Sequence, residues 1–207
     1  MCLIIHKPAG VAIPADLLDA ALPLNEDGFG VMGFHPRRGL LIHRQAQITL
    51  DGLLAFERAH RDAEYALHLR QRTRGDTEAH NLHPFTISGQ LYLMHNGTIR
   101  LPLRVPGRSD TWHFVHDVLR PLAQRRPGVL LDNAFIQLLE LALKPENKLA
   151  LMDYAEHRIV LINREHGAEL DGLWLSSTRW IDRGRLPLAA PPQAQERAYT
   201  AHDVQFI

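Results

Sequence analysis

The one cysteine of the 207-residue chain is Cys2, which directly follows Met1. Initiator methionine is generally removed when the next side chain is small, so we expect the mature chain to begin with Cys2. An α-amine titrates at about 7.7–8.0 and a cysteine thiol at about 8.5, so the amine can act as general base for the thiol of the same residue. The position predicts a self-activated nucleophile that needs no catalytic triad; the alternative is a cysteine buried as a small hydrophobe.

Three further segments carry polar residues that suit an amide substrate. Arg70, at the end of an alternating apolar segment, has a planar guanidinium that can hold a carboxylate through two hydrogen bonds. The side-chain amide of Asn96 and the backbone N–H of Gly97 form a donor pair that suits an oxyanion. Asp110 can pair with an ammonium group. Each segment also has an ordinary structural interpretation: a solvated basic turn, an Asn-Gly hairpin and a helix N-cap.

The overall composition limits the remaining functional classes. The chain has 23 Lys and Arg residues, 23 Asp and Glu residues and 45% hydrophobic residues, so its formal charge is zero. Such a balance favours neither nucleic acid nor an anionic membrane as a partner. No run approaches the roughly 18 apolar residues of a transmembrane helix, and the opening apolar run is too short for a signal peptide, so we expect a cytoplasmic protein. A single cysteine excludes an internal disulfide. The sequence has no glycine-rich nucleotide-binding motif, so we expect no cofactor.

Hydrophobic periodicity predicts the elements that must position these residues. Strands are predicted over 2–5, 29–34, 40–43, 64–70, 91–94, 148–152, 158–162 and 173–176. Helices are predicted over 15–22, 49–60, 112–122 and 134–143. Strands followed by helices and then by more strands favour a layered α+β domain over a doubly wound one. We expect this domain to span residues 1–185 and to be followed by a Pro/Ala-rich tail over 186–207.

Taken together, the motifs resemble those of a known family. They occur in the order Cys2-Leu-Ile-Ile, Asn25-Glu-Asp-Gly-Phe-Gly, His68-x-Arg-x-x-Thr-x-Gly, Asn81-x-His-Pro-Phe, His95-Asn-Gly-Thr-Ile and Ser109-Asp-Thr. This pattern, over residues 2–111, is similar to the glutaminase domain of class II glutamine amidotransferases, which are N-terminal-nucleophile hydrolases. The resemblance implies a four-layer αββα sandwich that releases ammonia from glutamine.

The resemblance also implies the catalytic residues. Cys2 would attack the side-chain amide of glutamine and pass through a tetrahedral intermediate to a thioester. Asn96 and Gly97 would form the oxyanion hole. Neither a metal nor a cofactor is implied.

Substrate-binding residues follow from the same resemblance. Arg70 would bind the α-carboxylate of glutamine and Asp110 its α-ammonium, with Thr73 lining the same pocket. The chain departs from familiar members at Leu3, where they have glycine, and at Gln71, where they have tryptophan. These departures leave room for another γ-glutamyl amide or a small primary amide as the substrate. The ammonia would be released or passed to a separate synthase subunit.

Two other interpretations stay open from the sequence. The chain could be a catalytically silent relative that binds an amino acid or a protein partner. It could also be a metal hydrolase, because it has 13 histidines, among them the pairs His80/His83 and His113/His116. The chain has no H-E-x-x-H motif and no carboxylate at a suitable spacing, so the sequence predicts no metal site.

Overall fold

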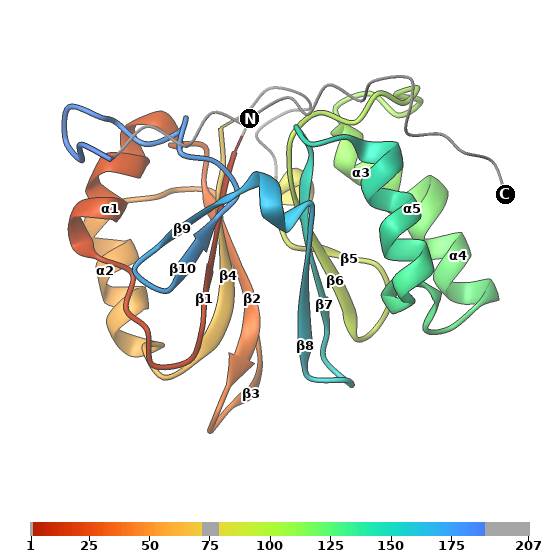
Figure 1. Cartoon of the computed structure of the whole chain (residues 1–207), viewed down its shortest axis with the longest axis horizontal. Helices are drawn as coiled ribbons and strands as arrows, with labels where there is room; N and C mark the ends of the chain where they lie inside the picture. Colours follow the sequence, from red (N-terminus) through yellow and green to blue (C-terminus); the bar gives the residue numbers. More distant parts are fainter. Residues whose placement is uncertain (1, 72–78, 189–207) are drawn as a thin grey trace, which may run out of the picture.

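The computed structural model describes residues 2–71 and 79–188, which form two antiparallel sheets with helices on their outer sides (Figure 1). The first sheet has the strand order β3-β2-β4-β1-β10-β9. Its strands are β1 (Leu3–Lys7), β2 (Phe29–His35), β3 (Gly39–Gln45), β4 (Glu64–Leu69), β9 (Ala168–Leu170) and β10 (Leu173–Leu175). The second sheet has the order β5-β6-β7-β8, with β5 (Phe85–Thr86), β6 (Leu91–Asn96), β7 (Lys148–Asp153) and β8 (Arg158–Ile162).

The helices divide between the two sheets. Helices α1 (Ala15–Ala21) and α2 (Leu50–Ala59) cover the first sheet, whereas α3 (Asp110–Phe114), α4 (Arg120–Arg125) and α5 (Asn133–Leu143) cover the second (Figure 1). A π-helical turn (Val115–Leu119) joins α3 to α4. Short 3-10 turns span Leu22–Leu24, Ala79–Asn81, Val129–Leu131 and Arg164–His166. The N-caps of α2, α3 and α5 are the side chains of Thr49, Ser109 and Asp132, each accepting a backbone N–H, as such polar residues do at a helix start.

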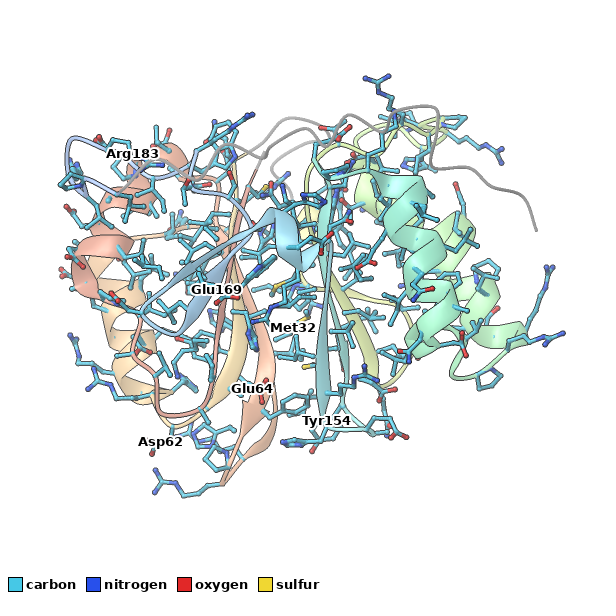
Figure 2. All side chains as sticks on the ribbon, viewed as in Figure 1. Met32, Asp62, Glu64, Tyr154, Glu169 and Arg183 are labelled. Atoms are coloured by element: carbon cyan, nitrogen blue, oxygen red, sulfur yellow. The ribbon has the colours of Figure 1, made fainter. Side chains whose placement is uncertain are left out.

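Three apolar clusters hold these layers together. The first sheet contributes side chains to two of these clusters, because successive residues of a strand point to opposite faces. In β1, Leu3 and Ile5 pack toward α1 and α2, and Ile4 packs toward the second sheet. The cluster between the sheets includes Met32 of β2 and Met94 of β6, and Figure 2 shows Met32 pointing into that space. The third cluster joins the second sheet to its helices. Burial on both faces therefore fixes the register of β1, the strand that begins directly after Cys2.

Most of the elements predicted from periodicity are confirmed, as is the α+β class. All strand pairs are antiparallel, which excludes a doubly wound parallel sheet. The periodicity missed β5 and β9, because strands of two and three residues are too short to show an alternation. In the described part of the chain, no helix is long and apolar enough to cross a membrane.

The end of the described chain packs on the first sheet. Leu186 and Leu188 are partly buried against the cluster that contains α1 and α2. Arg183 donates to the carbonyl of Leu188 at 2.7 Å. The domain boundary at residue 185 stays a prediction, since residues 189–207 lie outside the described part.

Candidate active site

Cys2 lies at the end of the first sheet where the two sheets meet. Its backbone nitrogen donates to Oδ1 of Asn96 at 3.1 Å, and its Sγ contacts the carbonyl oxygen of Gln71 at 3.5 Å. Burial raises the pKa of the Cys2 thiol, and the hydrogen bond to Gln71 and the positive charge of Arg70 lower it by less. The resting sulfur is therefore a neutral thiol, and a base is needed to make it a nucleophile.

The side-chain amide of Asn96 is oriented by a hydroxyl from a distant strand end. Its Nδ2 donates to Oγ of Ser176 at 2.9 Å, and the same oxygen accepts the backbone N–H of Ile4 at 2.8 Å. The backbone N–H of Ser176 in turn donates to the carbonyl of Ile4 at 2.8 Å. An amide nitrogen carries two hydrogens, so one N–H of Asn96 remains for another acceptor. The sequence analysis missed Ser176 as a site residue; its one signal is its place at the end of a predicted strand.

Gly97 occupies a position that no other residue fits. Its φ is +147°, and a Cβ built there would lie 2.3 Å from Oδ1 and 2.9 Å from Cα of Asn147. The residues before it belong to β6, which pairs with β5 and β7. The hairpin interpretation of Asn96-Gly97 is therefore wrong, because the chain leaves Gly97 toward the helical segment instead of turning back into a paired strand.

A buried histidine ties this strand end to the start of α3. His95 contacts Oγ1 of Thr111 through Nδ1 at 2.8 Å and Oδ1 of Asn147 through Nε2 at 3.0 Å. Asp110, beside Thr111, accepts the backbone N–H of Ile99 at 2.7 Å through Oδ2. Its Oδ1 accepts the N–H of Thr111 at 3.0 Å. These contacts hold the Asp110 carboxylate in place, and Asp110 is 6% exposed.

Arg70 is held by the loop that precedes β2. Its backbone N–H donates to the carbonyl of Gly28 at 2.9 Å, and its carbonyl accepts the N–H of Asp27 at 3.0 Å. Asn25, at the start of that loop, donates to the carbonyls of Ala21 and Trp180. Arg70 precedes Gln71, whose carbonyl contacts Cys2 Sγ, and Asp110 precedes Thr111, which contacts the His95 ring next to Asn96. The charge of Arg70 lowers the pKa of the Cys2 thiol, and that of Asp110 raises it.

The structure thus brings together five of the six residues predicted from the sequence: Cys2, Arg70, Asn96, Gly97 and Asp110. Thr73, the sixth, lies outside the described residues. Both members of the His113/His116 pair have structural contacts: His113 accepts the backbone N–H of Arg104 at 3.0 Å, and His116 stacks on Trp112. Within residues 2–71 and 79–188, no group of three or more His, Cys, Asp or Glu side chains is placed to hold a metal ion.

Two buried histidines lie between the sheets next to this site. His68 of β4 contacts the carbonyl oxygen of His95 at 3.2 Å and stacks on His83 with ring centroids 3.9 Å apart. Neither ring nitrogen of His83 has a hydrogen-bond partner among the residues that the structure describes. Burial lowers the pKa of His68 from 6.5 to about 3 and moves that of His83 in the same direction. Both rings are therefore neutral at pH 7.

This pair predicts a loss of stability in acid. Below pH 6.5 the unfolded chain binds a proton at His68 that the folded chain does not bind until about pH 3. The contribution of neutral His68 is therefore fully present above pH 6.5 and is lost as the pH falls below it, by up to about 1.4 kcal/mol per pH unit. Urea unfolding at pH 7 and pH 5 measures the change.

The matched variants for this experiment are His68→Gln, which keeps a donor for His95, and His166→Gln at an exposed histidine. We expect the first to flatten the dependence of the unfolding free energy on pH and the second to leave it unchanged. Equal slopes in all three proteins would contradict the assignment to His68.

Comparisons with known proteins give structural likenesses alone. No protein-family model matches the sequence, and no curated protein matches it. Glutamine phosphoribosylpyrophosphate (PRPP) amidotransferase from B. subtilis matches over 84% of this chain and 40% of its own, at 16% identity and a TM-score of 0.48. A glutamine aminotransferase class-II domain protein from Silicibacter pomeroyi matches over 74% of this chain and 73% of its own, at 17% identity and a TM-score of 0.38. The chain thus spans about 40% of the length of the first structure.

Proposed function

We propose that this chain is an N-terminal-nucleophile amidohydrolase of the class II glutamine amidotransferase type. The observation that carries the proposal is the hydrogen bond from the Cys2 nitrogen to Asn96 Oδ1, formed where the opposite charges of Arg70 and Asp110 also act. On this proposal the two sheets and their outer helices form the αββα sandwich of N-terminal-nucleophile hydrolases, within a domain over residues 1–185.

The first half of the reaction forms a thioester. After removal of Met1, the neutral α-amine of Cys2 takes the thiol proton, and Asn96 Oδ1 orients the amine by accepting one of its N–H groups. The sulfur attacks the amide carbon, and the second N–H of Asn96 with the backbone N–H of Gly97 stabilises the oxyanion. The C–N bond then breaks, the amine returns the proton to the leaving nitrogen, and ammonia departs.

The second half restores the enzyme. A water molecule gives a proton to the α-amine and attacks the thioester carbon, and the same oxyanion donors act again. The C–S bond breaks, the thiol regains its proton, and the free carboxylic acid leaves. Ammonia is released to solvent or taken up by a separate synthase subunit.

Recognition of the substrate rests on two opposite charges. A γ-glutamyl group ends in an α-carboxylate and an α-ammonium, so it needs one cation and one anion. We assign Arg70 to the carboxylate, because a guanidinium binds it through two parallel hydrogen bonds, and Asp110 to the ammonium. Thr73 is assigned to the same pocket. Glutamine or another γ-glutamyl amide is then the substrate class.

Mass spectrometry of the intact protein tests the proposal. We expect the purified chain to lack Met1 and to gain one equivalent of a glutamine analogue that carries an electrophilic carbon in place of the amide. Peptide mapping should find that label on Cys2, and an excess of glutamine should protect it. A chain that keeps Met1, or a label that glutamine does not prevent, would contradict the proposal, since a blocked α-amine cannot act as the base. A relative that binds glutamine without catalysis would take up no label.

A further inference from the structure

A cavity lies beside the site, on the side of Asn96 formed by β7 and the segment after β10. Its volume is about 430 Å³, and Asn96 and Ser176 form part of its wall. Because Asn96 also accepts the hydrogen bond from Cys2, one side chain contributes to both the cavity and the nucleophile's surroundings. A space of this size accommodates a small metabolite group.

Two cations face this cavity. Lys148, which lies directly opposite Asn96 in the pairing of β6 with β7, lines it together with Arg179. Burial lowers the pKa of Lys148, and the positive charge of Arg179 lowers it further. Glu146, also in the wall, acts in the opposite direction and more weakly than Arg179. The cavity therefore has an excess of positive charge around Lys148.

Within the described part of the chain, neither cation is paired with a carboxylate at ion-pair distance. Neither side chain forms a hydrogen bond or an ion pair with another residue within the described ranges 2–71 and 79–188. Other arginines nearby are paired: Arg164 contacts Glu169 at 2.8 Å, and Arg185 contacts Asp19 at 2.9 Å. A half-buried ammonium beside a guanidinium is unfavourable unless an anion compensates it.

Two hydroxyl groups lie in the wall of the same cavity as the cations. Oγ of Ser177 accepts the backbone N–H of Arg179 at 3.1 Å, and Oγ1 of Thr178 accepts from Arg183 at 2.9 Å. Both hydroxyls line the cavity and use these contacts as acceptors, so their own hydrogens can be donated. Carboxylate and phosphate oxygens accept from this combination of donors.

We propose that this cavity binds an anionic group, a carboxylate or a phosphate, on the amine half of the amide substrate. The inference rests on the proposed function. If Arg70 and Asp110 bind the glutamyl half of the substrate and Asn96 binds its carbonyl oxygen, the amine half must extend from the carbonyl carbon in another direction. The substrate class is then a γ-glutamyl amide whose amine portion carries a negative charge, or an equally charged amine that takes the glutamyl group from the thioester and releases the Cys2 thiol.

Two compounds that differ in one charge test this inference. γ-Glutamylglycine ends in a carboxylate on its amine half, and γ-glutamylglycinamide replaces that carboxylate with a neutral amide. We expect kcat/KM to favour the charged compound by roughly tenfold or more, the effect of one charge-assisted hydrogen bond. The double variant Lys148→Met/Arg179→Gln should lose this preference and keep its activity on glutamine. Arg158→Gln, at an exposed arginine outside the cavity, should retain it.

A binding measurement separates this inference from the proposed function. Calorimetry on the Cys2→Ala variant, with and without the two cation substitutions, compares the affinities of the same two compounds without turnover. A preference for the charged compound that disappears with the cations supports the anion site. If the wild-type protein hydrolyses neither compound while this preference persists, the proposed function fails and the anion site stands. Equal affinities for both compounds, or a preference that survives the double variant, would overturn the anion site.

Discussion

Replacing Cys2 with alanine is expected to reduce the release of ammonia from glutamine to background, a loss of at least about 10³-fold in kcat. No other cysteine exists in the chain to replace the thiol. Cys2→Ser should lose most of the activity as well, because a serine hydroxyl is far less acidic than a thiol and is therefore a weaker nucleophile beside the same α-amine. A coupled assay for ammonia, with glutamine as the substrate, measures both variants.

The fold should tolerate the change at Cys2. The one described side-chain contact of Cys2 is the long one to the carbonyl of Gln71, and the hydrogen bond to Asn96 comes from its backbone nitrogen. We therefore expect the melting temperature of Cys2→Ala to stay within about 4 °C of the wild-type value. Calorimetry should also find that it still binds glutamine. Unchanged ammonia release in this folded variant would eliminate Cys2 as the nucleophile.

Local patterns were enough to predict most of the elements around this site. The alternation over 64–70 places Arg70 at a strand end, and β4 confirms that strand. A helix N-cap is one interpretation of the segment around Asp110, and there Oγ of Ser109 accepts the N–H of Trp112 at 3.1 Å. In both cases the physical cause lies within a few residues: a two-residue repeat for a half-buried strand, and a short polar side chain at a helix start.

The contacts that orient the site could not be predicted in this way. Ser176 contacts Asn96 across 80 positions, and His95 contacts Asn147 across 52. The first contact depends on how the two sheets pack and the second on the pairing of β6 with β7, neither of which a local propensity encodes. The Asn96-Gly97 dipeptide shows the same limit, because its turn preference was overridden by the pairing of β6 with β7. The cavity beside Lys148 likewise combines β7 with segments after β8 and β10.

The second large effect is expected at Gly97. Gly97→Ala should lower kcat by about 10²-fold or more and destabilise the protein by about 2 kcal/mol or more. A side chain at φ +147° is strained, and the new Cβ would lie 2.3 Å from Oδ1 of Asn147. Asn147 cannot move away freely, because it contacts His95 through that same Oδ1 and donates to the carbonyl of Leu143. The strain must therefore shift either the backbone N–H assigned to the oxyanion or the His95 ring next to it.

Gly89→Ala is the matched control, because a Cβ at Gly89 meets nothing within 4 Å and its φ is not positive. This variant should keep the wild-type kcat and melting temperature. For Gly97→Ala, steady-state kinetics should be measured at a temperature where thermal unfolding shows the variant to be folded, so that lost turnover is separated from lost protein. A folded Gly97→Ala protein with wild-type kcat would contradict the oxyanion role, because the N–H could then move without consequence. If Gly97→Ala also had the wild-type melting temperature, the protein would relieve the contact between the new Cβ and Asn147 at no cost in stability. The close packing at the end of β6 would then not be what positions Asn96.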